Sequence, residues 1–461
     1  MNPFRSAAET AAAIGAGHVT SGAVLAECLD RIDRLNPMLN AFTTVTADRA
    51  RARAAAIDAS GAKPGPLTGV PFAVKNLIDV AGLPTLAGSK INHDHPPATV
   101  DAPVITRLEA AGAILVGALN MGEYAYDFTG ENAHHGPSRN PHDITRMTGG
   151  SSGGSGGAVG GGLVPLTLGS DTNGSIRVPA SFCGLFGLKP TYGRLTRAGS
   201  FAFVSSLDHL GPLARSVADL ALAYDAMQGY DPTDPVCVDR PADLVAGSIH
   251  QGIGGLRIAT AGGYFQAGAS VDALTALNAA VAALDASEIV TIPDTHRARS
   301  AAYIISTTEG AGLHLQRLRT RPRDFDPDVR DRLIAGALVP AAAVVQAQKF
   351  RRWYREQLLA LFQHVDAILA PATPTVAPLI GQKSIVLDGQ EMPLRPNIGI
   401  YTQPISFIGL PVVAVPIPTA SGLPIGVQII TAPWREDLAL RIARALEAAG
   451  VAKAPTPKLE P

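Results

Sequence analysis

Two serines in glycine-rich motifs and one lysine in an apolar run have the side chains and contexts best suited to chemistry. Ser151 lies in GGSSGGSGG (149–157), and Ser175 lies further along the chain in GSDTNGSIRVPA (169–180). Lys75 lies upstream in GVPFAVKNLIDV (69–80), where it interrupts an otherwise apolar segment. A serine with a base nearby can act as a nucleophile toward acyl groups, so these motifs indicate acyl-transfer chemistry.

The chemistry requires the lysine to be uncharged. A serine hydroxyl is a weak acid, and it attacks an amide only when a neighbouring base takes its proton. Lysine can serve as that base if burial lowers its pKa, and the apolar neighbours of Lys75 favour burial. A second hydroxyl such as Ser151 can pass a proton between the two groups, because it donates and accepts at once.

Two other interpretations of the glycine-rich segment fit less well. A phosphate-binding P-loop needs a lysine after the glycines, and none follows here. Residues 150–154 match the GxSxG pattern of a nucleophile elbow, but an elbow follows a buried strand and residues 140–148 are polar and broken by proline. A serine–histidine arrangement has no recognisable motif around the available histidines, which we expect to be structural or exposed: His134, His135 and His209.

The combined motifs resemble those of the amidase-signature family. There, the lysine of a PFxVKD/N segment and the serines of GGSSGGS and GSDxGGSIRxPA form a Ser–cisSer–Lys triad. The resemblance implies that Ser175 is the nucleophile, that Ser151 follows a cis peptide and relays a proton, and that Lys75 is the base. It extends over nearly the whole chain, with further matching stretches at 86–90, 205–216 and 422–430. It also implies an α/β fold, with a large twisted mixed sheet and helices on both faces.

The turn before the second serine is expected to form an oxyanion hole. The backbone N–H groups of Thr172, Asn173, Gly174 and Ser175 would point at the oxygen of the tetrahedral intermediate. The family usually has glycine at position 173, and asparagine is one of the few other residues that tolerate left-handed geometry. The flanking pair Asp171 and Arg177 is expected to brace the turn as a structural ion pair.

Within the family, further stretches resemble enzymes of cyanuric acid degradation. The stretches are 120–132 and 371–381. They imply a substrate that is a small carboxylated ureide or amide, hydrolysed with release of ammonia and without a cofactor or a metal. Enzymes of this kind work with a small helical partner subunit, so such a partner and an oligomeric state are expected. The substrate carboxylate would need a cation, for which the DVRDR segment offers Arg330 and Arg332.

Besides another amidase of the same family, two rival functions remain open. The glutaminase subunit of tRNA-dependent amidotransferases belongs to the same family, but it normally has an aspartate in a DxFT segment that holds the ammonium of glutamine. The corresponding stretch here is 399–402, GIYT, which lacks the acid. A noncatalytic scaffold that retains the fold is the second rival, and the presence of the complete triad argues against it.

Alternating strands and helices are expected to position these residues. An amphipathic helix is predicted from a cap at Ser21 to Asn36, followed by a connector at 61–68 and a buried strand at 69–80. A helix at 102–112 and a strand at 113–119 complete a strand–helix–strand unit, which favours parallel pairing. We therefore predict an N-terminal helical segment at residues 1–65, packed on a catalytic domain at 66–461.

The rest of the chain repeats this alternation. Residues 163–180 are predicted to form a strand, a turn and the start of a helix. Outer helices are predicted at 271–284 and 341–362, and a closing helix at 437–450. Apolar runs punctuated by proline predict strands at 367–378 and 409–418.

Composition excludes several classes of function. The chain has 461 residues, of which 46% are hydrophobic and 17% charged, with a formal net charge of −1. Such a chain can bury a large core, but it has no basic excess for nucleic acid. No signal peptide or membrane-spanning apolar run is recognisable, and the three widely spaced cysteines favour neither disulfides nor a zinc site. These features predict a cytoplasmic protein.

Overall fold

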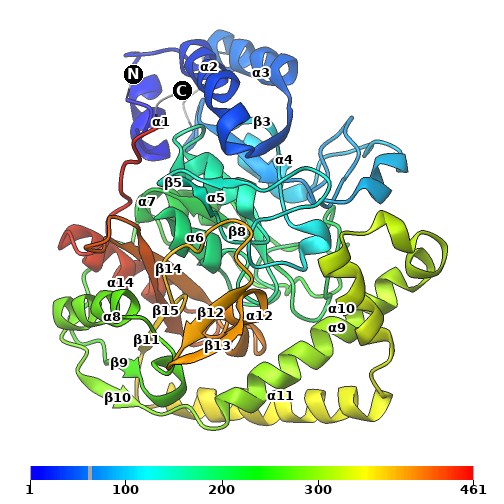
Figure 1. Ribbon diagram of the computed structural model, residues 1–461. Coiled ribbons are helices and arrows are strands. Elements are labelled where there is room, and N and C mark those ends of the chain that lie inside the picture. Colours follow the sequence, from blue (N-terminus) through cyan, green and yellow to red (C-terminus); the bar gives the residue numbers. More distant parts are fainter. Residues whose placement is uncertain (1, 61–64, 460–461) are drawn as a thin grey trace.

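An 11-stranded sheet forms the centre of the computed structural model, which describes residues 2–60 and 65–459 (Figure 1). The strand order is β1-β3-β2-β6-β8-β7-β14-β15-β11-β9-β10. The strands are β1 (Phe42–Val45), β2 (Pro71–Lys75), β3 (Ile114–Leu119), β6 (Leu166–Asp171), β7 (Phe186–Lys189), β8 (His209–Ala214), β9 (Ile258–Ala261), β10 (Glu288–Val290), β11 (Ala367–Pro371), β14 (Val412–Ile417) and β15 (Ile425–Thr431). Two small hairpins are β4 (Arg139–Asn140) with β5 (Asp143–Met147), and β12 (Ser384–Leu387) with β13 (Gln390–Pro393).

The sheet is mixed. Strands β3, β2 and β6 are mutually parallel, as are β11, β9 and β10, whereas the strands between these groups pair antiparallel. The predicted parallel pairing of the first two buried strands is confirmed by the register of β2 on β3. The α/β class with a large mixed sheet is confirmed as well.

Helices cover both faces of the sheet, and the strand sequences explain why. Successive side chains of a strand point to opposite faces, so in β2 the residues Phe72 and Val74 join one apolar core while Ala73 joins the other. On the first side lie α1 (Ala7–Gly15), α4 (Pro103–Ala110), α7 (Val217–Met227), α8 (Val271–Leu284) and α14 (Glu436–Ala448). On the second side lie α2 (Ser21–Leu39), α3 (Ala47–Ala59), α5 (Gly153–Gly160) and α6 (Arg177–Cys183).

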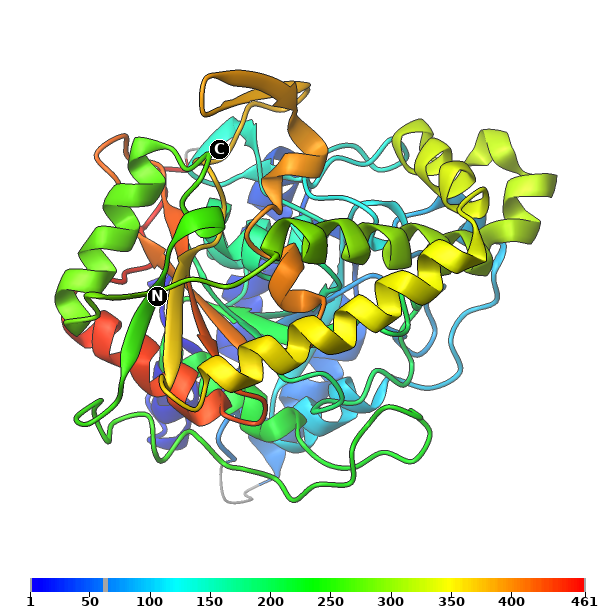
Figure 2. The same ribbon diagram turned by 90° about the horizontal axis from the view of Figure 1, so that it is seen from below.

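Three helices form an arm beside the sheet, visible at the right of Figure 2. They are α9 (Thr295–Thr320), α10 (Pro327–Ala337) and α11 (Ala341–Leu361), and α9 packs against both of the others. The short helices are α12 (Leu394–Ile398), α13 (Gln403–Ser406), η1 (Lys90–Asp94), η2 (Glu123–Ala125), η3 (Gly263–Phe265) and η4 (Pro322–Asp324). The helices predicted at 271–284, 341–362 and 437–450 are therefore confirmed, within a residue or two at their ends.

Helix α2 departs from the prediction at both ends. Its cap is Thr20, whose Oγ1 accepts a hydrogen bond from the Ala23 N–H at 3.1 Å, and Ser21 is the first helical residue. The helix also continues through Pro37 to Leu39, although proline has no N–H for the helical hydrogen bonds, and the Asn40 N–H donates to the Asn36 carbonyl at 2.7 Å. The predicted end at Asn36 was thus wrong; the left-handed residue Asn40 ends the helix instead.

The N-terminal segment also contributes to the sheet. Strand β1 lies within residues 1–65 and pairs antiparallel with β3 at the sheet edge. The division of the chain at residue 65 remains a prediction, and residues 61–64 of the predicted connector lie outside the described residues. Among the described residues, no single helix is long and apolar enough to cross a membrane; α10 and α11 meet that test only as a pair bent by 96°.

Candidate active site

Lys75 and two serines meet where the parallel strands β2 and β6 end. Lys75 is the last residue of β2, and its Nζ lies 2.6 Å from Ser151 Oγ and 2.8 Å from Ser170 Oγ. Lys75 and Ser151 are fully buried, and Ser170 is nearly so. Carboxyl ends of parallel strands are a common place for ligand sites, because the chain turns away there and leaves a crevice.

Burial makes Lys75 suited to act as a base. Desolvation lowers the pKa of Lys75 to about 7, although the nearby carboxylates Asp208, Asp171 and Asp127 favour the charged form. A substantial fraction of the side chain is therefore uncharged near neutral pH, and an uncharged amine can accept a proton from Ser151.

The backbone before Ser151 is held against the turn at residues 127–130. The Gly150–Ser151 peptide is cis, as the resemblance implies. The N–H of Gly150 donates to the Phe128 carbonyl at 2.8 Å. A Cβ atom at position 150 would lie 2.4 Å from Asp127 Oδ2 and 2.7 Å from the Gly130 nitrogen, so only glycine fits.

The turn that carries Ser175 presents a row of free donors. Among the described residues, none of the backbone N–H groups of residues 172–175 donates a hydrogen bond to another protein group. The turn is fixed from outside: Thr402 Oγ1 donates to the Asn173 carbonyl at 2.7 Å, and Thr172 Oγ1 donates to Asp208 at 2.6 Å. At Gly174 φ is +144°, and a Cβ would lie 2.2 Å from Thr402 Oγ1. These four N–H groups are available to a developing oxyanion.

The predicted ion pair beneath this turn is present. Arg177 and Asp171 are both fully buried, with Nε to Oδ2 at 3.0 Å and Nη2 to Oδ1 at 3.0 Å. The guanidinium holds the pKa of the Asp171 carboxyl well below its usual range. Asp171 also accepts the Ile176 N–H at 3.2 Å, which ties the end of β6 to the start of α6. The pair braces the turn.

A small pocket in front of Ser175 brings in residues from distant segments. It is lined by Ala125, Tyr126, Asp127, Phe128, Thr172, Asn173, Ser175, Phe203, Tyr303, Ser306, Arg332 and Gln403. Of the two predicted arginines, Arg332 lines this pocket and Arg330 does not; Arg330 pairs with Asp331 at 2.8 Å instead. None of the three histidines considered above lines it, and the buried His209 contacts the Asp171 carbonyl at 3.0 Å.

Several residues at this site were missed from the sequence. Ser170 is a polar residue near the end of a strand whose residues are all buried, a signal that could have identified it. Tyr126 and Phe128 lie in the stretch 120–132, which was noted only for its resemblance. Ser306 of α9 and Gln403 of α13 reach the pocket only through tertiary packing, so no local pattern marks them.

The nucleophile-elbow interpretation finds no support in the structure. The strand that precedes Ser151 is β5, which pairs with β4 in a hairpin outside the main sheet and is partly exposed. An elbow would require a buried strand of the central sheet.

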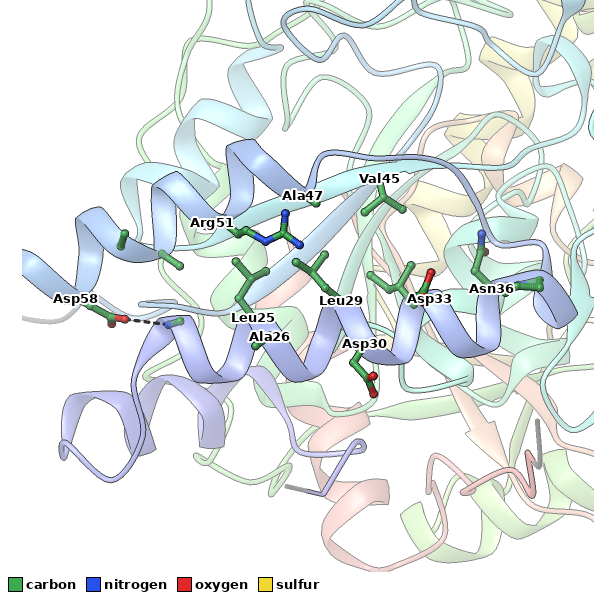
Figure 3. A pocket seen from close by; sticks show the side chains of 15 residues that line it. Leu25, Ala26, Leu29, Asp30, Asp33, Asn36, Val45, Ala47, Arg51 and Asp58 are labelled. Carbon is green, nitrogen blue, oxygen red and sulfur yellow. Dashed lines mark hydrogen bonds between the residues drawn. The ribbon is translucent and has the colours of Figure 1, made fainter.

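A larger cavity lies outside this site. It is a groove of about 830 Å³ between α2 and α3, with Leu25 and Leu29 on one wall and Arg51 on the other (Figure 3). At one end Asp58 of α3 accepts the backbone N–H groups that begin α2, at 2.8 and 2.9 Å. Lys75, Ser151 and Ser175 are not among its lining residues, so the groove is distinct from the candidate active site.

Comparison with known proteins identifies the family. The family model described as Amidase matches residues 23–440. The chain belongs to the amidase family. This amidase is 53% identical to AtzE, named as a subunit of the 1-carboxybiuret hydrolase of Pseudomonas sp. (strain ADP), over 95% of this chain and 97% of that protein. It is 38% identical to a glutamyl-tRNA(Gln) amidotransferase subunit from Roseiflexus sp. (strain RS-1), over 94% and 93% of the two chains.

Solved structures agree with the fold of this amidase. One, described as a vestigial protein complex that reveals the evolutionary origins of an s-triazine catabolic enzyme, superposes with a TM-score of 0.97 at 52% identity, over 98% of this chain and 100% of that chain. A peptide amidase in complex with chymostatin superposes with a TM-score of 0.86 at 27% identity, over 98% and 99% of the chains. As a member of the family, this protein is a hydrolase that acts on amide bonds.

Proposed function

We propose that this amidase is a 1-carboxybiuret hydrolase with Ser175 as nucleophile, Ser151 as proton relay and Lys75 as base. One observation supports this choice of substrate: the chain is 53% identical to a relative of that name over 97% of the relative's length. The buried contact of 2.6 Å between Lys75 Nζ and Ser151 Oγ supports the chemistry.

Attack begins with two coupled proton transfers. Uncharged Lys75 accepts the proton of Ser151, which accepts the proton of Ser175 as Ser175 Oγ bonds to the amide carbon. The carbonyl oxygen becomes an oxyanion and receives hydrogen bonds from the free N–H groups of residues 172–175. These donors are fixed before the substrate arrives, so little reorganisation is needed in the transition state.

The same relay then runs in reverse. Lys75 returns its proton through Ser151 to the amide nitrogen, the carbon–nitrogen bond breaks, and ammonia leaves. Water attacks the remaining ester of Ser175 with the same groups acting again as base and relay. From 1-carboxybiuret the products are ammonia and a dicarboxylated urea, and Lys75 ends in its starting state.

Arg332 is the proposed anchor for the substrate carboxylate. It lies at the wall of the Ser175 pocket, and its guanidinium carbon is 3.9 Å from the centre of the Tyr126 ring. Its Nε donates to the Asp328 carbonyl at 2.7 Å and its Nη2 to the Tyr126 carbonyl, which leaves Nη1 and the second hydrogen of Nη2 to bind a carboxylate through two parallel hydrogen bonds. Arg330, the other arginine expected for this role, lacks that placement.

Ammonia release from a panel of amides tests the function. The purified enzyme should hydrolyse 1-carboxybiuret with a kcat/KM at least about 100-fold above those for biuret, glutamine and simple alkyl amides. A preference for glutamine would instead support the amidotransferase alternative. No turnover of 1-carboxybiuret alongside turnover of another amide would overturn the proposed substrate.

The glutaminase alternative rests on relatives that are 38% identical. Its acidic residue for the glutamine ammonium would fall at position 399, which is glycine here. A Cβ at Gly399 would lie 2.5 Å from Phe128 Cζ, so the Phe128 ring fills the space that an acidic side chain would need. This packing favours a substrate with a carboxylate and no ammonium group.

An oligomeric state with a small helical partner subunit is part of the proposal. The relative in Pseudomonas is named as one subunit of its enzyme, and the solved structure with a TM-score of 0.97 is described as a protein complex. Affinity capture from the native host, followed by light scattering, should give a particle heavier than one chain of 47.6 kDa with a small second polypeptide. A cytoplasmic location remains a prediction from the sequence.

A further inference from the structure

Tyr126 is buried in the Ser175 pocket, yet its hydroxyl is unused. Among the described residues, Tyr126 Oη has no hydrogen-bond partner although the side chain is only 6% exposed. The ring itself is held firmly, between the guanidinium of Arg332 and the ring of Phe203 at a centroid distance of 4.7 Å. Burial raises the pKa of Tyr126, so the hydroxyl keeps its proton and can donate it.

Asn173 presents a second unused polar atom in the same pocket. Its Nδ2 donates to Ser306 Oγ at 2.8 Å, which fixes the amide plane, while Oδ1 has no partner among the described residues. The residue is 7% exposed and lies two positions before Ser175. A free acceptor therefore lies beside the nucleophile, held in place by a hydrogen bond on its other side.

Unpaired buried polar atoms destabilise a fold, because each has lost its water without gaining a partner. Two of them in one pocket, each on a side chain fixed by other contacts, indicate groups kept for a ligand. Their chemistry is complementary: Tyr126 Oη is a donor and Asn173 Oδ1 is an acceptor.

We propose that Tyr126 and Asn173 form a recognition pair for the acyl-urea unit of the substrate. Tyr126 Oη donates to a carbonyl or carboxylate oxygen beyond the scissile amide, and Asn173 Oδ1 accepts the N–H of the adjacent ureide nitrogen. This deepens the proposed function, on which it rests for the position of the nucleophile. A simple alkyl amide offers neither group and leaves both atoms unpaired, so the pair selects against it.

The hydroxyl of Tyr126 can be removed with little other change. Tyr126→Phe should lower kcat/KM for 1-carboxybiuret about 10-fold, with a smaller loss for a simple alkyl amide. Because no protein hydrogen bond is broken, the melting temperature should stay the same or rise. The matched control is Tyr124→Phe, which breaks the 3.1 Å bond from Tyr124 Oη to Asn92 Oδ1 outside the pocket. The control should lower the melting temperature and leave the ratio between the two substrates unchanged.

The acceptor is tested with a second pair of variants. Asn173→Ala removes Oδ1 and also the bond to Ser306, whereas Ser306→Ala removes only that bond. Asn173→Ala should reduce the preference for the ureide about 10-fold, and clearly more than Ser306→Ala does. Equal effects of the two variants would overturn the role of Oδ1.

A binding measurement separates this inference from the proposed function. The affinity of the Ser175→Ala protein for biuret, measured by calorimetry, should fall about 10-fold when Tyr126→Phe or Asn173→Ala is added. If 1-carboxybiuret is not a substrate but biuret binding weakens in this way, the proposed function fails and the recognition pair stands. If 1-carboxybiuret is hydrolysed but neither variant changes the substrate ratio or the affinity, the recognition pair is wrong and the function stands.

Discussion

Lys75 Nζ and Ser151 Oγ lie 2.6 Å apart, and both side chains are fully buried. The contact joins the last residue of a central strand to a residue that follows a cis peptide at the start of α5. Because desolvation lowers the pKa of Lys75 to about 7, the contact places a partly uncharged amine beside a hydroxyl, as the proposed base and relay require.

The pH profile follows from that shift. In the proposed mechanism the uncharged form of Lys75 is the base, so kcat/KM should rise as pH increases and the ammonium loses its proton, with a midpoint near the pKa of about 7. Initial rates of ammonia release from about pH 5.5 to about pH 9 measure this limb. A rate that falls over this range, or that stays level in its acidic part, would argue against a lysine base.

Ser170 should tune the base without being essential. Its Oγ lies 2.8 Å from Lys75 Nζ and stabilises the ammonium form by accepting a hydrogen bond. Ser170→Ala should therefore move the acidic limb of the profile to lower pH and reduce kcat about 10-fold through looser placement of the amine. Ser170→Thr, which keeps a hydroxyl, is the control and should retain the wild-type limb. If the acidic part of the pH profile does not move in the Ser170→Ala variant, Ser170 does not influence the pKa of Lys75.

Gly174→Ala should disrupt the turn at Ser175. The new Cβ would lie 2.2 Å from Thr402 Oγ1, and residue 174 has a φ of +144°, which alanine rarely adopts. The turn must therefore shift, and its N–H groups no longer point at the position of the oxyanion. We expect a loss of about 1–3 kcal/mol in the free energy of unfolding and a fall in kcat of at least about 100-fold. Gly252→Ala is the control, since it has a φ of +72° but open space around the Cβ; it should cost about 1 kcal/mol and leave activity intact. Similar losses in both variants would contradict the argument from crowding.

Arg332 and Arg330 offer a matched pair on one helix. Arg332→Lys should raise KM for 1-carboxybiuret about 10-fold or more with a smaller change for neutral amides, because the bidentate contact to the carboxylate is lost. Arg330→Lys should change neither, since Arg330 lies outside the Ser175 pocket. The anchor lies elsewhere if both variants behave alike.

Elements with strong local signals were predicted well. The apolar runs that became β2, β3 and β6 and the periodic helices α8, α11 and α14 were all recognised, because burial on both faces or along one stripe marks the sequence itself. The error at the end of α2 arose because the prediction treated proline as a helix breaker, whereas Pro37 lies inside the helix and the left-handed residue Asn40 ends it.

Only the site residues that lie in long sequence motifs were predicted. Lys75, Ser151 and Ser175 stand in long motifs, whereas Ser170 could be placed beside Lys75 only by the parallel pairing of β6 with β2. The choice between Arg330 and Arg332 depended on how α10 is rotated against the pocket, which the three consecutive charged residues at 330–332 do not fix. Tyr126 and Asn173 were likewise not recognised as a pair, since their unpaired atoms are a property of the packed structure.

Ammonia release by the Ser175→Ala protein is the most direct test of Ser175 as the nucleophile. Activity on 1-carboxybiuret should fall at least about 1000-fold, because the attacking oxygen is lost. The melting temperature should stay close to that of the wild type, since no protein group depends on a hydrogen bond from this hydroxyl in the described part of the chain. A folded Ser175→Ala protein that keeps more than about a tenth of the wild-type rate would contradict the assignment of Ser175 as the nucleophile.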